Sequence, residues 1–158
     1  MTFNNGAPKI PLDYLEQGHD ITPCNNKMPI LSKWQNKVIK KDEWNDKYIS
    51  HNIGLKLGGK SDVDIDNPIV KKFINLYLKS CGAIYGRKSN PSSHYLFLGE
   101  LKSFKYNMPN ELEHYCKGFP HGNTLLEIRS GNGHQSIAPG SIVMDEDVEW
   151  SKYANINS

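Results

Sequence analysis

The chain has 158 residues, of which 37% are hydrophobic and 10% aromatic, and its formal net charge is +2. This length predicts one globular domain over residues 1–158, and the apolar content is too high for a disordered chain. No apolar run reaches the length of a membrane span, and the N-terminal residues lack the layout of a secretory signal. Because the three cysteines are widely spaced, a disulfide scaffold is not expected, and we predict an intracellular, cytoplasmic protein with no membrane partner.

The charge is distributed unevenly along the chain. Residues 24–105 hold 15 Lys or Arg against 7 acids, whereas residues 106–158 hold 3 against 7. A basic first two-thirds is typical of a surface that binds a polyanion. Lysines also cover ordinary solvated surfaces, so the charge alone favours nucleic acid and plain solvent equally.

The predicted elements follow an alternating α/β order. Short helices are expected at residues 11–18, ended by Gly18, and at residues 40–49, where Trp44 and Tyr48 lie one turn apart. Residues 52–59 predict a strand that ends in a Gly-Gly turn. Four more strands are expected at residues 83–86, 93–99, 124–130 and 134–143. The polar tail at 151–158 indicates a frayed end or a cut in a longer chain.

A longer helix is predicted over residues 67–81. Asn67 can cap its first turn, and Pro68 suits the first helical position. Its apolar stripe is formed by Ile69, Val70, Phe73, Ile74 and Tyr77.

An acidic stretch, SDVDIDNP at residues 61–68, precedes this helix. Alternation predicts a strand with Asp62, Asp64 and Asp66 on one face, where their repulsion requires a cation, a basic cluster or open solvent. Such carboxylates can hold divalent cations, although solvated acids explain the strand alone at least as well. A calcium loop is excluded because Asn67 and Phe73 occupy its required Gly and Glu positions.

Two later stretches carry further polar side chains. Residues 86–97 place cationic and hydrogen-bonding groups around a proline turn, suited to a phosphate chain, namely Arg87, Lys88, Ser92, Ser93 and His94. Residues 125–141 place Glu127 and Arg129 on one face of a strand before a Gly-rich turn. A lone His is more often structural, and Glu127 and Arg129 can simply pair with each other.

Taken in order, these stretches resemble the primase-polymerase (prim-pol) branch of the archaeo-eukaryotic primase superfamily, found in replication proteins of plasmids, phages and other mobile elements. Asp64-Ile65-Asp66 with the following Asn-Pro is similar to the first motif of that family, and Ser92-Ser93-His94 to the second. LLEIRSGNGHQSIAPGS is similar to the third motif over nearly its whole length. The resemblance extends from about Pro8 to Val143.

The resemblance implies an α+β fold, the archaeo-eukaryotic primase-type catalytic core, in which a mixed central sheet has an RRM-like half and flanking helices. It also implies template-directed nucleotidyl transfer by a DNA primase, a DNA polymerase or both. Asp64, Asp66 and Glu127 would bind two Mg²⁺ or Mn²⁺ ions, with His94 as a further catalytic residue. The nucleotide phosphates would be held by His94, Ser92, Ser93, Arg129, Arg87 and Lys88.

The implied partners are a single-stranded DNA template, a primer and nucleoside triphosphates. A helicase is expected, fused to the domain or encoded nearby, because the chain is predicted to be part of a longer replication protein. Two other functions remain open at this point. A non-catalytic single-stranded nucleic-acid-binding module would share the fold, and a metal-dependent nuclease would use similar acids.

Two positions depart from the family pattern. Glu127 stands where many relatives carry Asp, which lengthens the ligand arm. Asp62 stands where an apolar residue is usual, so we expect it at an exposed start of the strand.

Lys56 and Lys60 are expected either to contact template or primer phosphates or to lie at the solvated surface.

Several side chains outside the motifs have two explanations. His114, Cys116 and His121 supply at most three zinc ligands, so we favour a metal-free loop there. The tryptophans can stack on bases, but packing is the more usual role of Trp34, Trp44 and Trp150.

Overall fold

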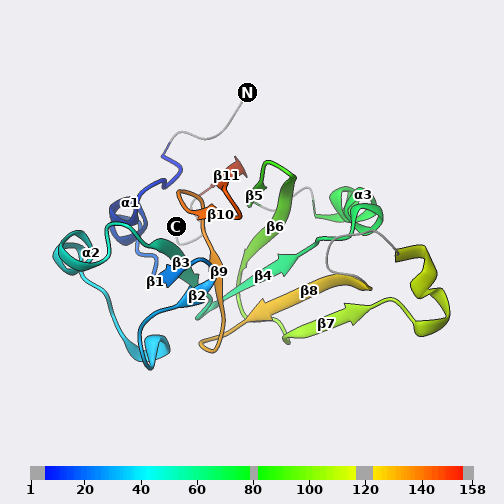
Figure 1. Ribbon diagram of the computed structural model, residues 1–158, viewed down its shortest axis with the longest axis horizontal. Coiled ribbons are helices and arrows are strands. Elements are labelled where there is room, and N and C mark those ends of the chain that lie inside the picture. The colour runs from blue at the N-terminus through cyan, green and yellow to red at the C-terminus, as the bar shows by residue number, and fades with distance from the viewer. Residues whose placement is uncertain (1–5, 79–81, 117–122, 155–158) are drawn as a thin grey trace.

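Two antiparallel sheets form the centre of the computed structural model, which describes residues 6–78, 82–116 and 123–154 (Figure 1). The smaller sheet has the strand order β2-β1-β3-β9, and the larger has the order β10-β11-β5-β6-β4-β8-β7. The strands are β1 (Ile21–Asn25), β2 (Met28–Pro29), β3 (Asn52–Lys56), β4 (Lys60–Asp64), β5 (Ala83–Arg87), β6 (Asn90–Leu98), β7 (Phe104–Asn107), β8 (Thr124–Ser130), β9 (Gln135–Ile137), β10 (Ile142–Val143) and β11 (Glu146–Lys152).

The helices lie at the two ends of the molecule as Figure 1 shows it. They are α1 (Pro11–Glu16), α2 (Lys41–Lys47) and α3 (Pro68–Tyr77), with 3-10 turns at η1 (Trp34–Asn36) and η2 (Asn110–Cys116). α1 and α2 lie beside the smaller sheet, and α3 follows β4 at the opposite end. Within the described part of the chain, no helix combines the length and the apolar character needed to cross a membrane.

The predicted α+β fold is confirmed. Every strand pair in the described residues is antiparallel, including those of the central sheet for which mixed directions were expected. The other predicted strands and helices are present, but the single strand expected at residues 134–143 is wrong: a turn at residues 139–140 divides it into β9 of the smaller sheet and β10 of the larger. The sequence did not predict β1, β2, β7 and β11. The expectation of a frayed tail is wrong for its first residues, because β11 runs to Lys152 and Tyr153 is buried.

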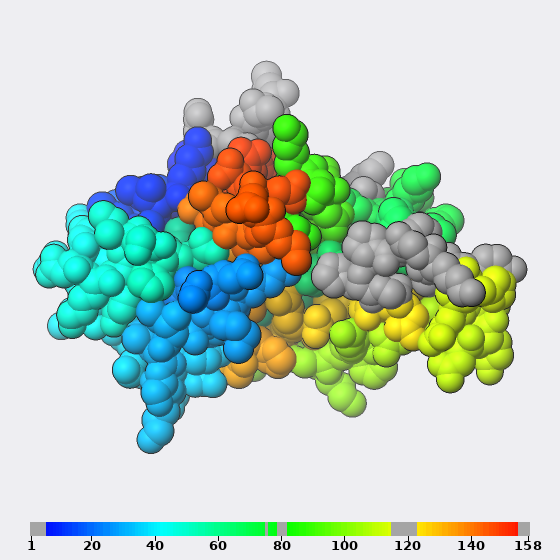
Figure 2. Space-filling view, in the orientation of Figure 1, coloured from blue at the N-terminus to red at the C-terminus, as the bar shows by residue number. Residues whose placement is uncertain are grey.

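The main hydrophobic core connects the two sheets. It includes Tyr14 of α1, Trp44 of α2 and Leu55 of β3, together with Tyr85 of β5 and Val148 of β11 from the larger sheet. In the space-filling view, β10 and β11 lie between the N-terminal segments and the hairpin formed by β5 and β6 (Figure 2). Burial of one continuous core fixes the two sheets relative to each other. Polar side chains that lie between the sheets are therefore also fixed in place.

A second, smaller core lies between α3 and the larger sheet. Val63, Ile65 and Tyr95 are buried there, and Val70 and Ile74 of α3 pack against them. The predicted cap is confirmed, since the Asn67 side chain accepts hydrogen bonds from the backbone N–H groups of residues 69 and 70. The predicted apolar stripe packs only in part, because its other members remain exposed, namely Ile69, Phe73 and Tyr77.

Candidate active site

The two acids of β4 lie on the sheet face opposite α3. Val63 points toward α3, and strand alternation turns Asp62 and Asp64 to the other face. The strand register places Asp64 opposite His94 of β6 and Glu127 of β8, and it places Asp62 opposite Arg129. Three neighbouring strands therefore bring charged side chains from three distant parts of the sequence onto one face.

Two cationic side chains contact the two acids. Arg129 Nη2 lies 2.6 Å from Asp64 Oδ2 and 3.0 Å from Asp62 Oδ2. His94 Nδ1 lies 3.0 Å from Asp62 Oδ2, and its Nε2 lies 3.7 Å from Asp64 Oδ1. The result is a cluster of two carboxylates and two basic groups with alternating contacts, in which opposite charges offset the cost of burial.

Asp62 is not at an exposed strand start, and the sequence-based expectation was wrong. Its side chain is 0% exposed and lies inside β4, which begins at Lys60. Ser136 of β9, in the smaller sheet, donates a hydrogen bond of 2.7 Å to Asp62 Oδ2. The second sheet therefore covers this position, which alternation within β4 could not reveal.

The charges shift one another's pKa values. Burial alone would raise the pKa of Asp62, but the His94 and Arg129 cations hold it below its usual range. Burial raises the pKa of Asp64, with Asp62 and Asp66 adding to the rise against the same cations. Burial would lower the pKa of His94, but Asp64 and Asp62 more than offset this effect and raise it. The contact therefore favours the ionised form of Asp62 and the protonated form of His94, each relative to the isolated side chain.

The other two predicted metal ligands border this cluster. Asp66 follows the end of β4, and its carboxylate accepts a hydrogen bond of 2.9 Å from Asn90 Nδ2. Glu127 is half-buried on β8, directly across from Asp64 on one side and Lys105 of β7 on the other. The structure thus places all three predicted ligands around the C-terminal end of β4.

The donor set suits a hard divalent cation. Asp64, Asp66 and Glu127 offer carboxylate oxygens, which Mg²⁺ and Mn²⁺ prefer, and Asp64 Oδ1 is buried without a hydrogen-bond partner. Asp66 and Glu127 add two further carboxyl groups beside the cluster of two acids and two basic groups. Within the described residues, no three His, Cys, Asp or Glu side chains are already gathered closely enough to hold a metal.

The predicted phosphate-binding residues are only partly brought together. Arg87 and His94 line one small cavity, and Lys88 is exposed in the turn between β5 and β6. Ser92 donates a hydrogen bond of 2.8 Å to Ser151, and Ser93 is buried within β6. Arg87 also forms an ion pair with Glu146 at 3.5 Å.

Other side chains belong to the site although no motif indicated them. Lys27, in the turn between β1 and β2, lines the small cavity with Arg87 and His94. Tyr85 stacks on the His94 ring with a centroid distance of 4.7 Å and an interplanar angle of 9°. Its hydroxyl lies 2.5 Å from Ser136 Oγ. The only sequence signal for Tyr85 was its place in a predicted strand.

The two lysines expected at a phosphate-contacting or solvated surface are both buried, so both expectations were wrong. Lys56 Nζ lies 3.0 Å from Asp20 Oδ2 and also donates to the Lys37 carbonyl. Lys60 is 8% exposed, and burial lowers its pKa despite the opposing effect of Asp20. Strand pairing draws both side chains inside the fold.

Two of the tryptophans have packing roles, as expected. Trp44 is buried in the main core, and Trp150 lies edge-on to Tyr85 with centroids 5.2 Å apart. Trp34 is half-buried in η1. His114 lies in η2, but His121 and the side chain of Cys116 fall outside the described residues, so the prediction about zinc is untested there.

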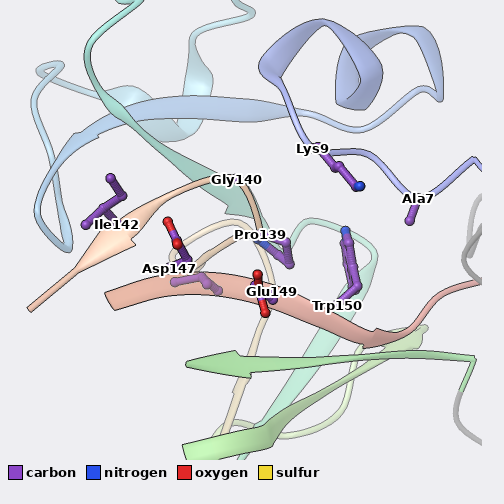
Figure 3. Close-up of a pocket in the computed structure, with 9 residues that line it drawn as sticks. Ala7, Lys9, Pro139, Gly140, Ile142, Asp147, Glu149 and Trp150 are labelled. Atoms are coloured by element: carbon purple, nitrogen blue, oxygen red, sulfur yellow. The ribbon is translucent and has the colours of Figure 1, made fainter. Parts of the chain in front are cut away.

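A larger cavity of about 430 Å³ is lined by other residues (Figure 3). It is formed by the segment before α1 and by β10 and β11, with Lys9, Asp147, Glu149 and Trp150 among its lining residues. None of the predicted catalytic or nucleotide-binding residues lines this cavity. The acidic cluster, and not this space, is therefore the candidate active site.

Comparison with known proteins identifies the family of the chain. No curated protein and no solved structure matches the chain significantly. The family described as bifunctional DNA primase/polymerase, N-terminal, matches residues 11–157 and so includes β4, β6 and β8. The chain belongs to this family of DNA primase/polymerase (Prim-Pol) domains.

Proposed function

We propose that this domain catalyses template-directed nucleotidyl transfer on single-stranded DNA, making primers, extending them, or both. The observation that carries the proposal is the meeting of Asp64, His94 and Arg129 on one sheet face, beside Asp66 and Glu127. A domain that only bound DNA would gain nothing from carboxylates that repel the phosphate backbone. Paired carboxylates beside basic groups are suited instead to a reaction of charged phosphates.

Asp64, Asp66 and Glu127 are the residues that we propose hold two Mg²⁺ or Mn²⁺ ions. When bound, these ions would acidify the attacking 3′-hydroxyl and neutralise charge on the triphosphate. Asp64 Oδ1 is the most direct point of attachment, because it accepts no hydrogen bond and its contact with His94 Nε2 is a long one, at 3.7 Å. Its other oxygen is held by Arg129, so metal binding and that ion pair are coupled.

His94 and Arg129 are the residues that we propose contact the phosphates of the incoming nucleotide. Their side chains are 21% and 22% exposed, so both reach the open side of the cluster while their partners lie deeper. Arg87 and Lys27 add positive charge at the cavity beside His94. Lys88, Ser92 and Ser93 are proposed to contribute from the adjoining hairpin. Contacts to phosphates carry no base information, which suits an enzyme that copies any template.

The wider setting is also a proposal. We infer that the domain serves the replication of a mobile genetic element, together with a helicase that is fused to it or encoded nearby. The likeness of the three motifs to those of such replication proteins supports this setting. The basic surplus of residues 24–105 supports DNA and nucleoside triphosphates as the bound partners.

Incorporation of labelled nucleotides tests the proposed activity. Wild type is compared with Asp64→Ala plus Asp66→Ala on single-stranded DNA, with and without an annealed primer, in Mg²⁺ and in Mn²⁺. We expect wild type to make or lengthen strands and the double variant to be slower by at least about a hundredfold. A matched control, Asp42→Ala plus Asp46→Ala, removes two exposed acids of α2 and should retain activity.

The other outcomes point to different functions. A folded wild type that binds single-stranded DNA without divalent ions, and incorporates nothing, would be a binding module. Shortened strands would indicate a metal-dependent nuclease. Products that appear without a primer would identify a primase, and products that require one would identify a polymerase.

A further inference from the structure

We propose that Asp62 is a positioning residue that orients His94 and Arg129 toward the phosphates of the nucleotide. This inference rests on the proposed function. Asp62 Oδ2 accepts from three side chains on three other strands, with distances of 3.0 Å to His94 Nδ1, 3.0 Å to Arg129 Nη2 and 2.7 Å to Ser136 Oγ. Asp62 is not among the motif residues that carry the resemblance, so this role is additional to theirs.

The depth of the side chains sets the direction in which the two basic groups point. The Asp62 side chain is 0% exposed, whereas those of His94 and Arg129 are about one-fifth exposed. Asp62 therefore lies behind both. An imidazole held at Nδ1 from behind presents Nε2 on its other edge, and this atom does lie on the Asp64 side of the ring.

The tilt of the His94 ring is fixed by a second contact that leads back to Asp62. Tyr85 stacks on the imidazole with an angle of 9° between the ring planes. Its hydroxyl meets Ser136 Oγ, and Ser136 in turn donates to Asp62. His94 is thus held along one edge and one face by side chains that are themselves tied together, which is how a functional group is preorganised.

The chemistry of Asp62 favours positioning over a purely structural role. A buried carboxylate is costly, and packed apolar side chains of similar size often serve stability as well or better. Arg129 uses the same nitrogen for both carboxylates. Asp62 therefore still holds Arg129 and His94 in place when Asp64 binds a metal ion. The side of each basic group that is turned away from Asp62 remains free to contact an anion.

Kinetics and nuclear magnetic resonance of Asp62→Asn test this role. Asparagine keeps the shape of the side chain but removes its charge. We expect the KM for the nucleoside triphosphate to rise about tenfold or more, with a smaller change in kcat. The reason is that the substitution weakens the charged hydrogen bonds that orient His94 and Arg129. The His94 ring signals, assigned through their loss in His94→Gln, should shift. Asp20→Asn, which alters an acid outside the site, should leave KM and these signals unchanged.

The remaining outcomes are decisive in either direction. A folded Asp62→Asn protein with wild-type KM and unshifted His94 signals would overturn the proposal. If Asp62→Asn does not fold, Ser136→Ala removes one bond to Asp62 and should cause a smaller rise in KM and a smaller shift of the same signals. Unchanged values in Ser136→Ala would then overturn it.

The test also separates this inference from the proposed function. If wild type incorporates no nucleotide, the proposed function fails. Binding of ATP and dATP and the His94 spectrum are then compared between wild type and Asp62→Asn. Weaker binding together with shifted signals supports positioning by Asp62, and identical behaviour rejects it.

Discussion

Arg129 holds the Asp64 carboxylate through one nitrogen at 2.6 Å, where a divalent cation would also be attracted. Replacing Arg129 with Gln removes that positive charge, so we predict that Mn²⁺ binds more tightly, by roughly tenfold, while nucleotide incorporation slows. Titration of Mn²⁺ by electron paramagnetic resonance measures the first effect without any turnover. Weaker Mn²⁺ binding in Arg129→Gln would show that the guanidinium supports the metal site instead of competing with it.

His19 gives a prediction for the dependence of stability on pH. Burial, assisted by Lys60, lowers the pKa of His19 from its ordinary value of 6.5 to about 4. As the pH falls from 6.5 to 4, the unfolded state takes up a proton that the folded state does not, so stability is lost in this window. The contribution is about 3 kcal/mol at most.

Urea unfolding of wild type and His19→Gln at pH 7 and pH 4 measures this contribution. Carboxylates also titrate in this range, so the comparison between the two proteins isolates His19. The free energy of unfolding should fall less in His19→Gln than in wild type. Equal falls in the two proteins would contradict the prediction.

At the scale of single residues, the sequence predicted which residues belong to the candidate site better than it predicted their surroundings. The motifs indicated Asp64, His94 and Arg129, and the structure brings these three together. Alternation placed Asp62 on the same face but could not show that Ser136, which is 74 residues away in the chain, covers it. Cross-sheet contacts of this kind leave no local pattern, and for the same reason Lys27 was not found.

Among the elements, the hairpin of β5 and β6 positions His94 and depends on Gly86. A Cβ at Gly86 would lie 2.9 Å from the backbone nitrogen of Ser92 and closer still to the Asn90 carbonyl oxygen. We predict that Gly86→Ala lowers the free energy of unfolding by about 2 kcal/mol or more, because backbone atoms cannot move aside without disturbing the hairpin.

Gly133→Ala provides the matched control for this prediction. A Cβ at Gly133 meets no atom within 4 Å, and the residue lies in the turn between β8 and β9. Its effect should stay within about 0.5 kcal/mol. Chemical denaturation of both variants measures the difference, and equal losses would show that the close approach at Gly86 is relieved at little cost.

Elements were predictable where their signals are local. The start of α3 follows from Asn67 and Pro68, which act within one turn. β1 was missed because it contains Pro23 and is buried at four consecutive residues, so it shows no alternation. β7 was missed for the opposite reason, since all four of its residues are exposed.

Over the whole molecule, the uneven charge predicts salt-dependent binding of single-stranded DNA. Lys27 lines the cavity beside His94, and Lys105 lies across from Glu127 on β7, so both are placed to meet a strand at the site. Affinity falls as salt rises, and the magnitude of the slope of log affinity against log salt concentration should decrease by about 0.7 for each phosphate contact that is removed. Fluorescence anisotropy at several salt concentrations measures this slope.

In the variant Lys27→Gln plus Lys105→Gln, the slope should therefore be shallower than in wild type by about 1.4. Lys41→Gln serves as the control, because Lys41 pairs with Glu16 on the exposed surface of α1 and α2, far along the fold from the acids. A slope that changes equally in both variants would mean that the strand does not follow the face bearing the acids.

The hydrogen bond from Ser136 to Asp62 also has a consequence for the order in which the protein folds. The partners of Asp62 lie 32, 67 and 74 residues away in sequence, and Ser136 belongs to the other sheet. A larger sheet formed alone would leave this carboxylate uncovered and without the Ser136 donor, because β9 belongs to the smaller sheet. Asp62 is therefore buried and fully hydrogen-bonded only when the two sheets dock, and the many long-range pairings make that joint step slow.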